Sequence, residues 1–581
     1  MVGTGRRYGP AHLVTLQGRH WDLSLFTRFR RTPSDDRPSD DDAAGRRHPV
    51  AGRVITALAC LLVLFALIAP NEITRLTPGA FVRIPLEGLV CVGLVLVLPV
   101  RAKRIVAVLA GVILGLLTIV KIVDIGFSAV LARPFDLVFD WTLFGAAEEF
   151  LRASVGGVGA IGAAIAATVL ALAVLVLMTL SILRLTRLVV RHNTAATRAV
   201  AVSGVVWVIC AALGAQIVPD VPVAGVATGR LLQVRTSLLD RRTFAKEAAV
   251  DAFRDTPNGQ LLTGLHGKDV LLAFVESYGR NAIENPRYAP QVDGVLDAGT
   301  RRLRAAGFAS RSAFLTSPTA GGGSWLAHAT LLSGLWVDNQ QRHNTLVNGH
   351  RFTLSSAFQR AGWRTAAVMP ATTGAWSEAS FYGYQRVYDR WSMGYRGPRF
   401  NWGTPPDQYT LSAFQRFERA PGHAPVMTEI PLVTSHAPWA PLPSGLIDWK
   451  TVGDGSVFGP MAAAGDSPES VWRSPSRIRT AYRTSIEYSL SSLISYVETY
   501  GDDKLVLVFL GDHQPTPLVT GQDPNRDVPI TIVAHDRKVL DQISGWGWQD
   551  GLRPGPKAPV WPMNAFRDRF LTAFGPPAHA R

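Results

Sequence analysis

Long apolar runs dominate the first 220 residues of the chain. Each run is close to the length of about 20 residues that a helix needs to cross the hydrocarbon core of a bilayer, although the first two are slightly short. The pattern therefore predicts a bundle of about five transmembrane helices. The five runs lie at 54–70, 84–99, 105–131, 157–183 and 199–218.

The hydrophobic pattern changes from Lys268 onward, where short apolar runs alternate with helix-like stretches. Such alternation is typical of an α/β domain, and we expect its sheet to be mainly parallel. The expected strands lie at 269–275, 364–369, 425–434, 504–510 and 529–534. The expected helices lie at 294–307, 352–361, 407–420 and 478–499.

These patterns divide the chain into four segments. Residues 1–50 are polar and aperiodic, which predicts a disordered cytoplasmic tail. Residues 51–218 form the expected transmembrane domain. Residues 219–267 form a juxtamembrane amphipathic linker, with a helix expected along the outer membrane surface. Residues 268–575 form the expected α/β domain.

The net charge of +15 would suggest nucleic-acid binding if the chain were soluble. Much of the arginine excess flanks apolar runs, where topology and anionic lipid explain it, so we exclude nucleic acid as a partner. The connections at 101–104 and 184–198 are basic, which predicts a cytoplasmic N-terminus. Five crossings then place the α/β domain outside the cytoplasm, as in a multi-pass protein of a bacterial inner membrane.

Polar and sulfur-containing residues within the apolar runs bear on structure. The three cysteines, Cys60, Cys91 and Cys210, all lie there, so the region after residue 220 can form no disulfide. Lys121 and Asp124 are three residues apart, and we expect them to form a structural ion pair that lowers the cost of burying both. A path for a lipid head group is the alternative interpretation of this pair.

Chemistry-bearing residues follow two of the expected strands. Glu276 follows the strand at 269–275, and Asp512 and His513 follow the strand at 504–510. Ligands of open α/β sheets collect at the carboxyl ends of strands. A carboxylate oxygen beside an imidazole nitrogen suits Zn²⁺ or Mn²⁺ better than Ca²⁺. A solvated polar turn would contain the same residue types, so each motif alone is a weak signal.

A glycine-rich turn at 319–323 leads into an expected helix that begins at Ser324. Glycines allow the backbone to approach a ligand closely, and a helix N-terminus favours an anion. Ser324 is therefore a candidate nucleophile that a metal ion would activate, although a serine that only caps the helix is the plain alternative. His436 follows the strand at 425–434 and could bind phosphate oxygens or protonate a leaving group.

Taken in order, these segments resemble the motif series of lipoteichoic acid synthases and phosphoethanolamine transferases, which are membrane proteins of the alkaline phosphatase/sulfatase superfamily. The membrane portion also looks like theirs, so the likeness covers roughly residues 50–570. Gly511-Asp512-His513 is its most specific element. The segments are Phe274–Ser277, the glycine-rich turn with Ser324, Thr434–Pro438 and Phe509–His513.

The resemblance implies a role for each residue. Glu276, Ser324, Asp512 and His513 would hold one divalent metal ion, with Mn²⁺ favoured and Zn²⁺ or Mg²⁺ as alternatives. Ser324 would also be the nucleophile of a ping-pong reaction, in which a phospholipid-type donor loses a phosphoryl group to an envelope glycan or lipid acceptor. His436 would contact the phosphoryl group, and Trp376 would contact the donor.

The chain departs from the family pattern at two places. The family nucleophile is usually threonine, so Thr316, Ser317 and Thr319 are alternatives to Ser324. Glu378 stands where the family has a basic residue, which leaves the donor head group open.

Other functions are compatible with the same fold. A phosphoric or sulfuric ester hydrolase of the same superfamily is an alternative, and hydrolysis of a phosphate ester would use the same metal and nucleophile. A formylglycine sulfatase is disfavoured because the region after residue 220 has no cysteine and Ser474-Pro-Ser-Arg477 has the wrong spacing. A non-catalytic envelope-binding scaffold remains an alternative, but it would be expected to have lost a metal ligand. The few charges within the apolar runs disfavour a transporter.

Overall fold

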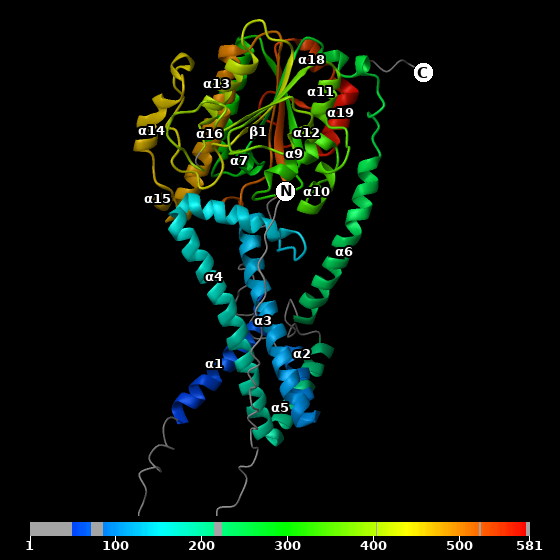
Figure 1. Cartoon of the computed structure of the whole chain (residues 1–581), viewed down its shortest axis with the longest axis vertical. Coiled ribbons are helices and arrows are strands. Elements are labelled where there is room, and N and C mark those ends of the chain that lie inside the picture. The colour runs from blue at the N-terminus through cyan, green and yellow to red at the C-terminus, as the bar shows by residue number, and fades with distance from the viewer. Residues whose placement is uncertain (1–48, 71–84, 214–222, 403, 522–524, 577–581) are drawn as a thin grey trace, which may run out of the picture. The chain divides into compact units, whose positions relative to one another are not determined.

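The computed structural model describes residues 49–70, 85–213, 223–402, 404–521 and 525–576. The expected disordered tail lies almost entirely outside these residues. The N-terminal part is built from helices (Figure 1). The last of them, α6, falls within residues 219–267, the range of the expected amphipathic linker. These helices are α1 Pro49–Ile68, α2 Leu86–Val97, α3 Val100–Leu131, α4 Leu143–Arg191, α5 Asn193–Ala212 and α6 Val223–Ala249.

Within the described residues, four helices are long and apolar enough to cross a membrane. The expected span at 84–99 is instead the 12-residue helix α2. A helix of that length rises only about 18 Å, which is short of the roughly 30 Å of hydrocarbon. The prediction of five transmembrane helices is thus corrected to four candidate spans. The number of crossings therefore no longer shows on which side of the membrane the α/β domain lies. The spans are Val50–Ile68, Val100–Leu131, Gly156–Arg191 and Asn193–Cys210.

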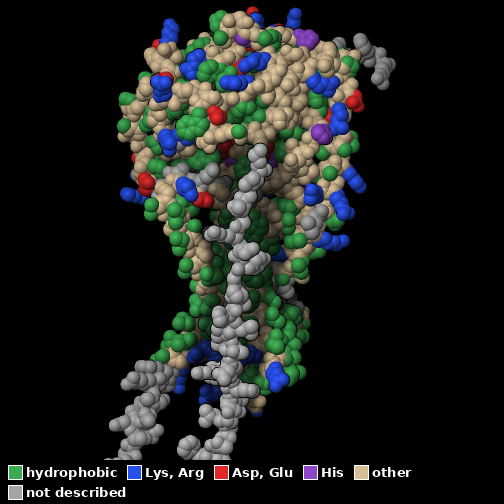
Figure 2. Space-filling model, in the orientation of Figure 1, with side chains coloured by type: hydrophobic (Ala, Val, Ile, Leu, Met, Phe, Trp, Pro, Cys, Tyr) green, Lys and Arg blue, Asp and Glu red, His purple; other side chains and the backbone are tan. Residues whose placement is uncertain are grey.

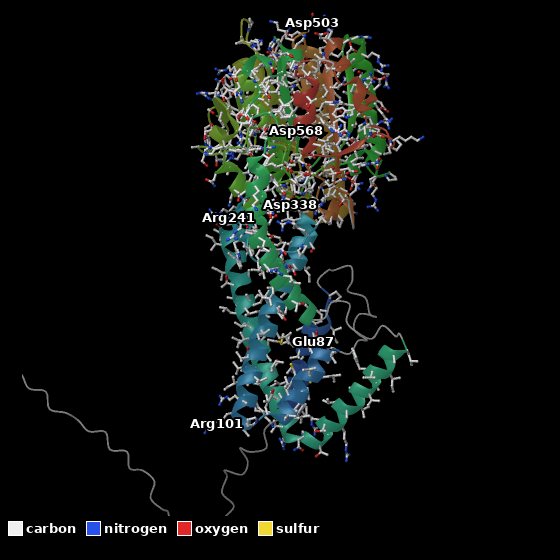
Figure 3. All side chains as sticks on the ribbon, turned by 90° about the vertical axis from the view of Figure 1, so that its right-hand side faces the viewer. Glu87, Arg101, Arg241, Asp338, Asp503 and Asp568 are labelled. Atoms are coloured by element: carbon white, nitrogen blue, oxygen red, sulfur yellow. The ribbon has the colours of Figure 1, made fainter. Side chains whose placement is uncertain are left out.

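The surface of these helices is apolar. Large side chains such as Leu58, Ile113 and Leu172 are more than half exposed. On the face shown in Figure 2, hydrophobic side chains cover the helical segments. Charged residues are sparse along the spans, and Arg101 lies in the first turn of α3 (Figure 3). Such a surface is stable against lipid rather than water.

Lys121 and Asp124 are both buried on α3, but they do not pair with each other. The Lys121 ammonium donates to the backbone oxygens of Ala66 and Ala69, each at 3.0 Å. The Asp124 carboxylate pairs with Arg230 of α6. The predicted ion pair is therefore wrong, because each charge finds a partner on another helix.

The second part of the chain contains one nine-stranded sheet with the order β4-β3-β5-β1-β6-β7-β2-β8, and β9 pairs with β2. All five expected strands are present, as β1, β3, β5, β6 and β7. The bounds are β1 Asp269–Val275, β2 Ala309–Thr316, β3 Arg364–Met369, β4 Arg386–Asp389, β5 Val426–Leu432, β6 Leu505–Gly511, β7 Asp527–Ala534, β8 Gln549–Asp550 and β9 Val560–Pro562.

The sheet is mixed, which corrects the prediction of a mainly parallel one. Strands β4, β3, β5, β1 and β6 are parallel. Strand β7 runs antiparallel to β6, and β2 runs antiparallel to β7. The antiparallel pairing arises because β6 returns to β7 without the long crossover helix that parallel neighbours need.

Helices cover both faces of the sheet (Figure 1). Leu271, Ala273 and Val275 pack toward α8, α13 and α16 on one face. Val270, Leu272 and Phe274 pack toward α9, α11 and α19 on the other. Strand β1 is buried along its whole length, as its continuous apolar sequence predicts.

The helices of this domain include all four expected ones, now with defined bounds. The longest is α16, which begins with a proline in its first turn. The helices are α7 Asn281–Glu284, α8 Ala289–Ala305, α9 Ser324–Ser333, α10 Gln340–Val347, α11 Leu354–Arg360, α12 Ala379–Tyr382, α13 Asp407–Glu418, α14 Gly459–Ala464, α15 Pro468–Trp472, α16 Pro475–Tyr500, α17 Pro517–Thr520, α18 Arg537–Asp541 and α19 Ala565–Ala573.

Candidate active site

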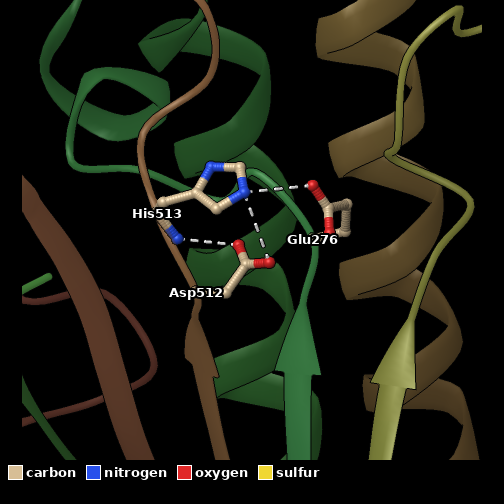
Figure 4. A group of neighbouring side chains, drawn as sticks. All are labelled: Glu276, Asp512 and His513. Atoms are coloured by element: carbon tan, nitrogen blue, oxygen red, sulfur yellow. Dashed lines mark hydrogen bonds and ion pairs between the residues drawn. The ribbon is translucent and has the colours of Figure 1, made fainter. Parts of the chain in front are cut away.

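Three chain segments meet at the carboxyl ends of β1 and β6. Glu276 follows β1, Asp512 and His513 follow β6, and all three are buried (Figure 4). The His513 Nε2 atom lies 3.4 Å from Glu276 Oε1 and 3.6 Å from Asp512 Oδ2. Ser324, the first residue of α9, donates its hydroxyl to Glu276 Oε2 at 2.9 Å and lies 3.2 Å from His513 Nε2. The four predicted metal ligands therefore form one cluster.

Backbone contacts hold the two strand ends together. The Asp512 Oδ1 atom accepts hydrogen bonds from the backbone N–H of Ser277 at 2.8 Å and of His513 at 2.7 Å. Gly511 must be glycine, because a Cβ there would lie 1.8 Å from the carbonyl oxygen of Tyr278. The close approach of β1 and β6 thus fixes the position of both carboxylates.

The alternative nucleophiles of the glycine-rich region do not face the cluster through their hydroxyl groups. The Ser317 hydroxyl donates to the Asp512 carbonyl, and the Thr319 hydroxyl donates to the Gly322 carbonyl, both at 2.6 Å. The Thr316 hydroxyl donates to Asp527 at 2.9 Å. Ser324 alone among the four donates to a predicted ligand side chain.

The donor set fits a small divalent ion. The ligand atoms of Glu276, Asp512 and His513 all lie within 4.8 Å of one another. Metal–ligand bonds of about 2.1 Å in a tetrahedron give a ligand–ligand distance of about 3.4 Å. The contact distances among the ligand atoms of Ser324, Glu276, Asp512 and His513 are 2.9 to 3.6 Å, which is close to that value. Oxygen and imidazole donors together suit Zn²⁺ or Mn²⁺.

The two carboxyl groups have opposite pKa shifts. Burial acts to raise the pKa of Glu276, but attraction by His513 and His436 and hydrogen bonds from Asp512 and Ser324 outweigh it and lower the pKa to about 2. Burial and the Glu276 charge raise the pKa of Asp512 well above its ordinary value. Two buried carboxylates at this spacing repel each other, so a cation is the natural partner that would let both ionise.

The imidazole of His513 is oriented for coordination. Its Nδ1 atom lies 2.8 Å from the carbonyl oxygen of Gln514, which only accepts hydrogen bonds. The proton of a neutral ring therefore belongs on Nδ1, and the lone pair of Nε2 faces Glu276 and Ser324. Such a backbone bond to the distal nitrogen is typical of metal-binding histidines.

His436 lies on the loop after β5, at the edge of this cluster. Its charge helps to lower the pKa of Glu276. The ring stacks on Trp402 with centroids 4.2 Å apart, and Nδ1 lies 2.5 Å from the Ala437 carbonyl oxygen. Asn401 holds the loop by donating to the carbonyl of Thr434 at 3.2 Å. The backbone contact thus fixes the Nδ1 side of the ring, and a contact between His436 and a substrate stays a prediction.

Trp376 does not contact the metal-ligand cluster directly. Its ring stacks on Tyr382 at 5.5 Å and on Tyr384 at 5.9 Å. Glu378 lies 3.5 Å from His343. The predicted head-group residue therefore belongs to an aromatic group beside the site, and its contact with a donor stays a prediction.

Comparison with known proteins identifies the class. Residues 268–525 match the family model described as Sulfatase. The α/β domain of this chain is thus a domain of the alkaline phosphatase/sulfatase superfamily, whose members are transferases and hydrolases. The chain is an enzyme that carries this domain after several apolar helices. No curated protein matches the sequence.

Several solved structures resemble the chain at low identity. Phosphoethanolamine transferase A from Neisseria meningitidis is 13% identical, with 90% of this chain and 95% of that chain covered and a TM-score of 0.44. The lipoteichoic acid synthase LtaP from Listeria monocytogenes is 14% identical over 58% of this chain and 78% of that chain, with a TM-score of 0.35. Phosphoglycerol transferase GacH from Streptococcus pyogenes is 13% identical over 58% of this chain and 90% of that chain, with a TM-score of 0.34.

Sequence reasoning missed several residues around the cluster. Trp402 carries no spacing signal that relates it to His436. Glu429 lies in the middle of β5, where a buried apolar residue is expected. His328 could have been predicted from the sequence, because it follows Ser324 by four residues and so lies one turn further along the same helix.

Proposed function

We propose that this protein is a membrane-anchored, metal-dependent phosphotransferase that acts on phospholipid-type donors to modify or build cell-envelope polymers. The observation that carries the proposal is the position of Ser324. Its hydroxyl lies at the start of α9, between Glu276 at 2.9 Å and His513 at 3.2 Å. Helix N-termini favour anions, so a phosphoryl group and its nucleophile would meet there.

Glu276, Ser324, Asp512 and His513 would hold the metal ion. When bound, it would lower the pKa of the Ser324 hydroxyl and offset negative charge on the phosphoryl oxygens. We favour Mn²⁺, with Zn²⁺ or Mg²⁺ as alternatives. The low pKa of Glu276 means that its carboxylate is ionised near neutral pH and accepts the hydrogen bond from Ser324.

The reaction would proceed in two displacements. In the first, Ser324 Oγ forms a bond to phosphorus, and the bond from phosphorus to the donor lipid oxygen breaks. The departing oxygen takes up one proton, and the Ser324 hydroxyl loses one. In the second, the acceptor hydroxyl oxygen forms a bond to phosphorus, the bond between phosphorus and Ser324 Oγ breaks, and one proton leaves the acceptor while one is taken up by Ser324 Oγ. The backbone N–H groups at the start of α9 would stabilise the phosphoryl oxygens in both steps.

His436 would serve the transferred group. Stacking on Trp402 and the contact between Nδ1 and the Ala437 carbonyl orient its ring, which leaves Nε2 for a phosphoryl or leaving-group oxygen. A histidine held in this way can donate a proton to the departing lipid oxygen. Trp376 would contact the donor head group from the neighbouring aromatic group.

The test is a search for the covalent intermediate. We would incubate the full-length protein in detergent with Mn²⁺ and phospholipids labelled in the head group, and measure intact mass. We expect an adduct on Ser324 whose mass identifies the transferred group. Ser324→Ala should form none, whereas Ser474→Ala, a change in a serine just before α16, should form as much as wild type.

Two further readouts separate related functions. Release of the adduct only by water would favour an ester hydrolase over a transferase. A folded protein that binds Mn²⁺ but forms no adduct and turns over none of the donors would contradict catalysis on phospholipids and favour the envelope-binding scaffold.

We further propose that the catalytic domain faces the cell envelope across a bacterial inner membrane, where the donor and acceptor would meet. The domain contains no native cysteine, so one introduced thiol reports its side. The Asp503 side chain is 82% exposed, which makes Asp503→Cys a suitable probe. Labelling by a membrane-impermeant maleimide in intact spheroplasts is expected. Labelling only after lysis would place the domain in the cytoplasm.

A further inference from the structure

A buried polar network lies next to the metal-ligand cluster. His328 lies on α9, one helical turn after Ser324. Its Nδ1 atom lies 2.7 Å from Glu429 Oε1. Glu429 is 1% exposed and lies in the middle of the sheet, between Leu272 of β1 and Ala367 of β3. A carboxylate buried so deeply is costly unless its partners are well placed.

Glu429 has a second partner that fixes its orientation. The Tyr384 hydroxyl donates to Glu429 Oε2. Burial and the Glu429 charge raise the pKa of Tyr384 well above its ordinary value, so the phenol keeps its proton at neutral pH. With both carboxylate oxygens occupied, Glu429 provides His328 with a rigid acceptor. Trp376 stacks on Tyr384, so the network also reaches the predicted donor-contacting residue.

The ring of His328 is also fixed by stacking. It lies on Phe274 with centroids 3.7 Å apart and planes only 13° from parallel. Phe274 belongs to β1, two residues before Glu276. One imidazole thus connects the strand that leads to Glu276 with the helix that begins at Ser324.

The second ring nitrogen of His328 lies in the protein interior. Its Nε2 atom is buried and has no hydrogen-bond partner among the described residues. Burial and Glu276 raise the pKa of Asp512, and His328 is among the groups that act against that increase.

We propose that His328 is a positioning residue: held by Glu429 and Phe274, it sets the spacing between Ser324 and Glu276 that the metal ion requires. The inference rests on the proposed metal site. A histidine that only fills the core would need neither a buried carboxylate in mid-sheet nor parallel stacking on the strand of a metal ligand. Groups that orient metal ligands from behind typically change metal affinity on the order of 10-fold to 100-fold when they are removed.

The experiment measures Mn²⁺ affinity of the full-length protein in detergent, from the electron paramagnetic resonance signal of free Mn²⁺. His328→Phe keeps a flat ring on Phe274 but loses the bond to Glu429, and we expect Mn²⁺ binding to weaken about 10-fold or more. Glu429→Gln removes the charged acceptor and should weaken binding similarly. His328→Gln retains an N–H donor and should recover part of the affinity.

His343→Phe is the matched control. His343 is also buried, at 2% exposed, and its Nε2 atom likewise has no hydrogen-bond partner among the described residues, but it lies on α10 rather than α9. Its Mn²⁺ affinity should equal that of wild type. Melting temperatures measured in parallel distinguish a loss of folding from a loss of positioning.

Each outcome bears on a different claim. A lower melting temperature with unchanged Mn²⁺ affinity in the His328 and Glu429 variants would make His328 a core residue only and overturn the inference. Failure of the wild type itself to bind Mn²⁺, Zn²⁺ or Mg²⁺ would instead refute the metal site. If His328→Phe does not fold, His328→Gln and Glu429→Gln, which preserve approximate size, still decide the question.

Discussion

The Ser324 hydroxyl and the Glu276 carboxylate lie 2.9 Å apart, although 48 residues separate them in the chain. One belongs to the first turn of a helix, and the other follows the central strand of the sheet. Their contact places a nucleophile against a predicted metal ligand.

Glu276→Gln should abolish the metal site while leaving the fold intact. The amide keeps the shape of the side chain and can still accept the hydrogen bond from Ser324, but it loses the charge that attracts a cation. We expect Mn²⁺ affinity to fall by about 100-fold or more, the upper end for changes around metal sites. Glu284→Gln, an exposed change on α7, is the control in the same titration. Equal affinity in both variants would exclude Glu276 as a ligand.

Gly511→Ala should damage both stability and the site. A Cβ there would collide with the Tyr278 carbonyl, so β6 must move away from β1 and displace Asp512. Overpacking of this kind costs roughly 1–3 kcal/mol in the free energy of unfolding. Gly294→Ala on α8, where a Cβ meets no atom within 4 Å, should be neutral or stabilising. Denaturant titration with Mn²⁺ binding measures both effects, and a Gly511→Ala protein with normal values would contradict the close-approach argument.

Asp407 should make the stability depend on pH. Burial raises its pKa to about 6, against hydrogen bonds from Ser489 and Thr434 that act to lower it. Because the folded pKa exceeds the unfolded value, the stabilising contribution is complete below about pH 4 and is lost as the pH rises through 6. The loss amounts to about 3 kcal/mol.

The comparison is with Asp407→Asn, which cannot ionise. Unfolding free energies measured from pH 4 to pH 7 should decline more steeply for wild type than for the variant. Parallel pH profiles would show that Asp407 titrates normally in the folded protein.

Asp251→Ala should destabilise the catalytic domain strongly. The fully buried Asp251 side chain lies 2.9 Å from Arg567 and 3.1 Å from Arg351, which are also buried. Burial and the Arg567 charge lower the pKa of Arg351 to about 10, so the Arg351 guanidinium stays charged at neutral pH. Without the Asp251 carboxylate, Arg351 and Arg567 lose their shared partner and only the half-exposed Asp568 still pairs with Arg567, at a cost of about 3–5 kcal/mol. Asp255→Ala, a nearby exposed change, should have little effect in the same unfolding experiment.

Much of the catalytic domain could be predicted from local patterns. The five predicted strands are short apolar runs in which most residues are buried, and burial on both faces makes such strands visible in the sequence. Strand β2 escaped prediction because its first half, Ala309–Arg311, is only partly buried and carries polar side chains. The antiparallel placement of β7 was also hidden, since a strand's direction depends on the path of the connection before it.

Strand order explains why Glu276, Asp512 and His513 could be grouped, because parallel neighbours such as β1 and β6 end at the same edge of the sheet. Only the family resemblance added Ser324, which begins a helix, to this group. The membrane portion shows the limit of such rules. Apolar composition alone suggested a span at 84–99, but the helix there has 12 residues, and length decides whether a helix crosses a bilayer.

The sequence by itself determined the order of the parts: apolar helices first, then an α/β domain with acidic and histidine residues after its strands. These are local properties, since hydrophobic period and residue type can be read within a short window. Tertiary structure alone decided that Lys121 and Asp124 find different partners, that Trp402 meets His436, and that His328 and Glu429 lie behind the metal ligands. Such contacts join residues far apart in the chain, and only the packing of helices against the sheet brings them together.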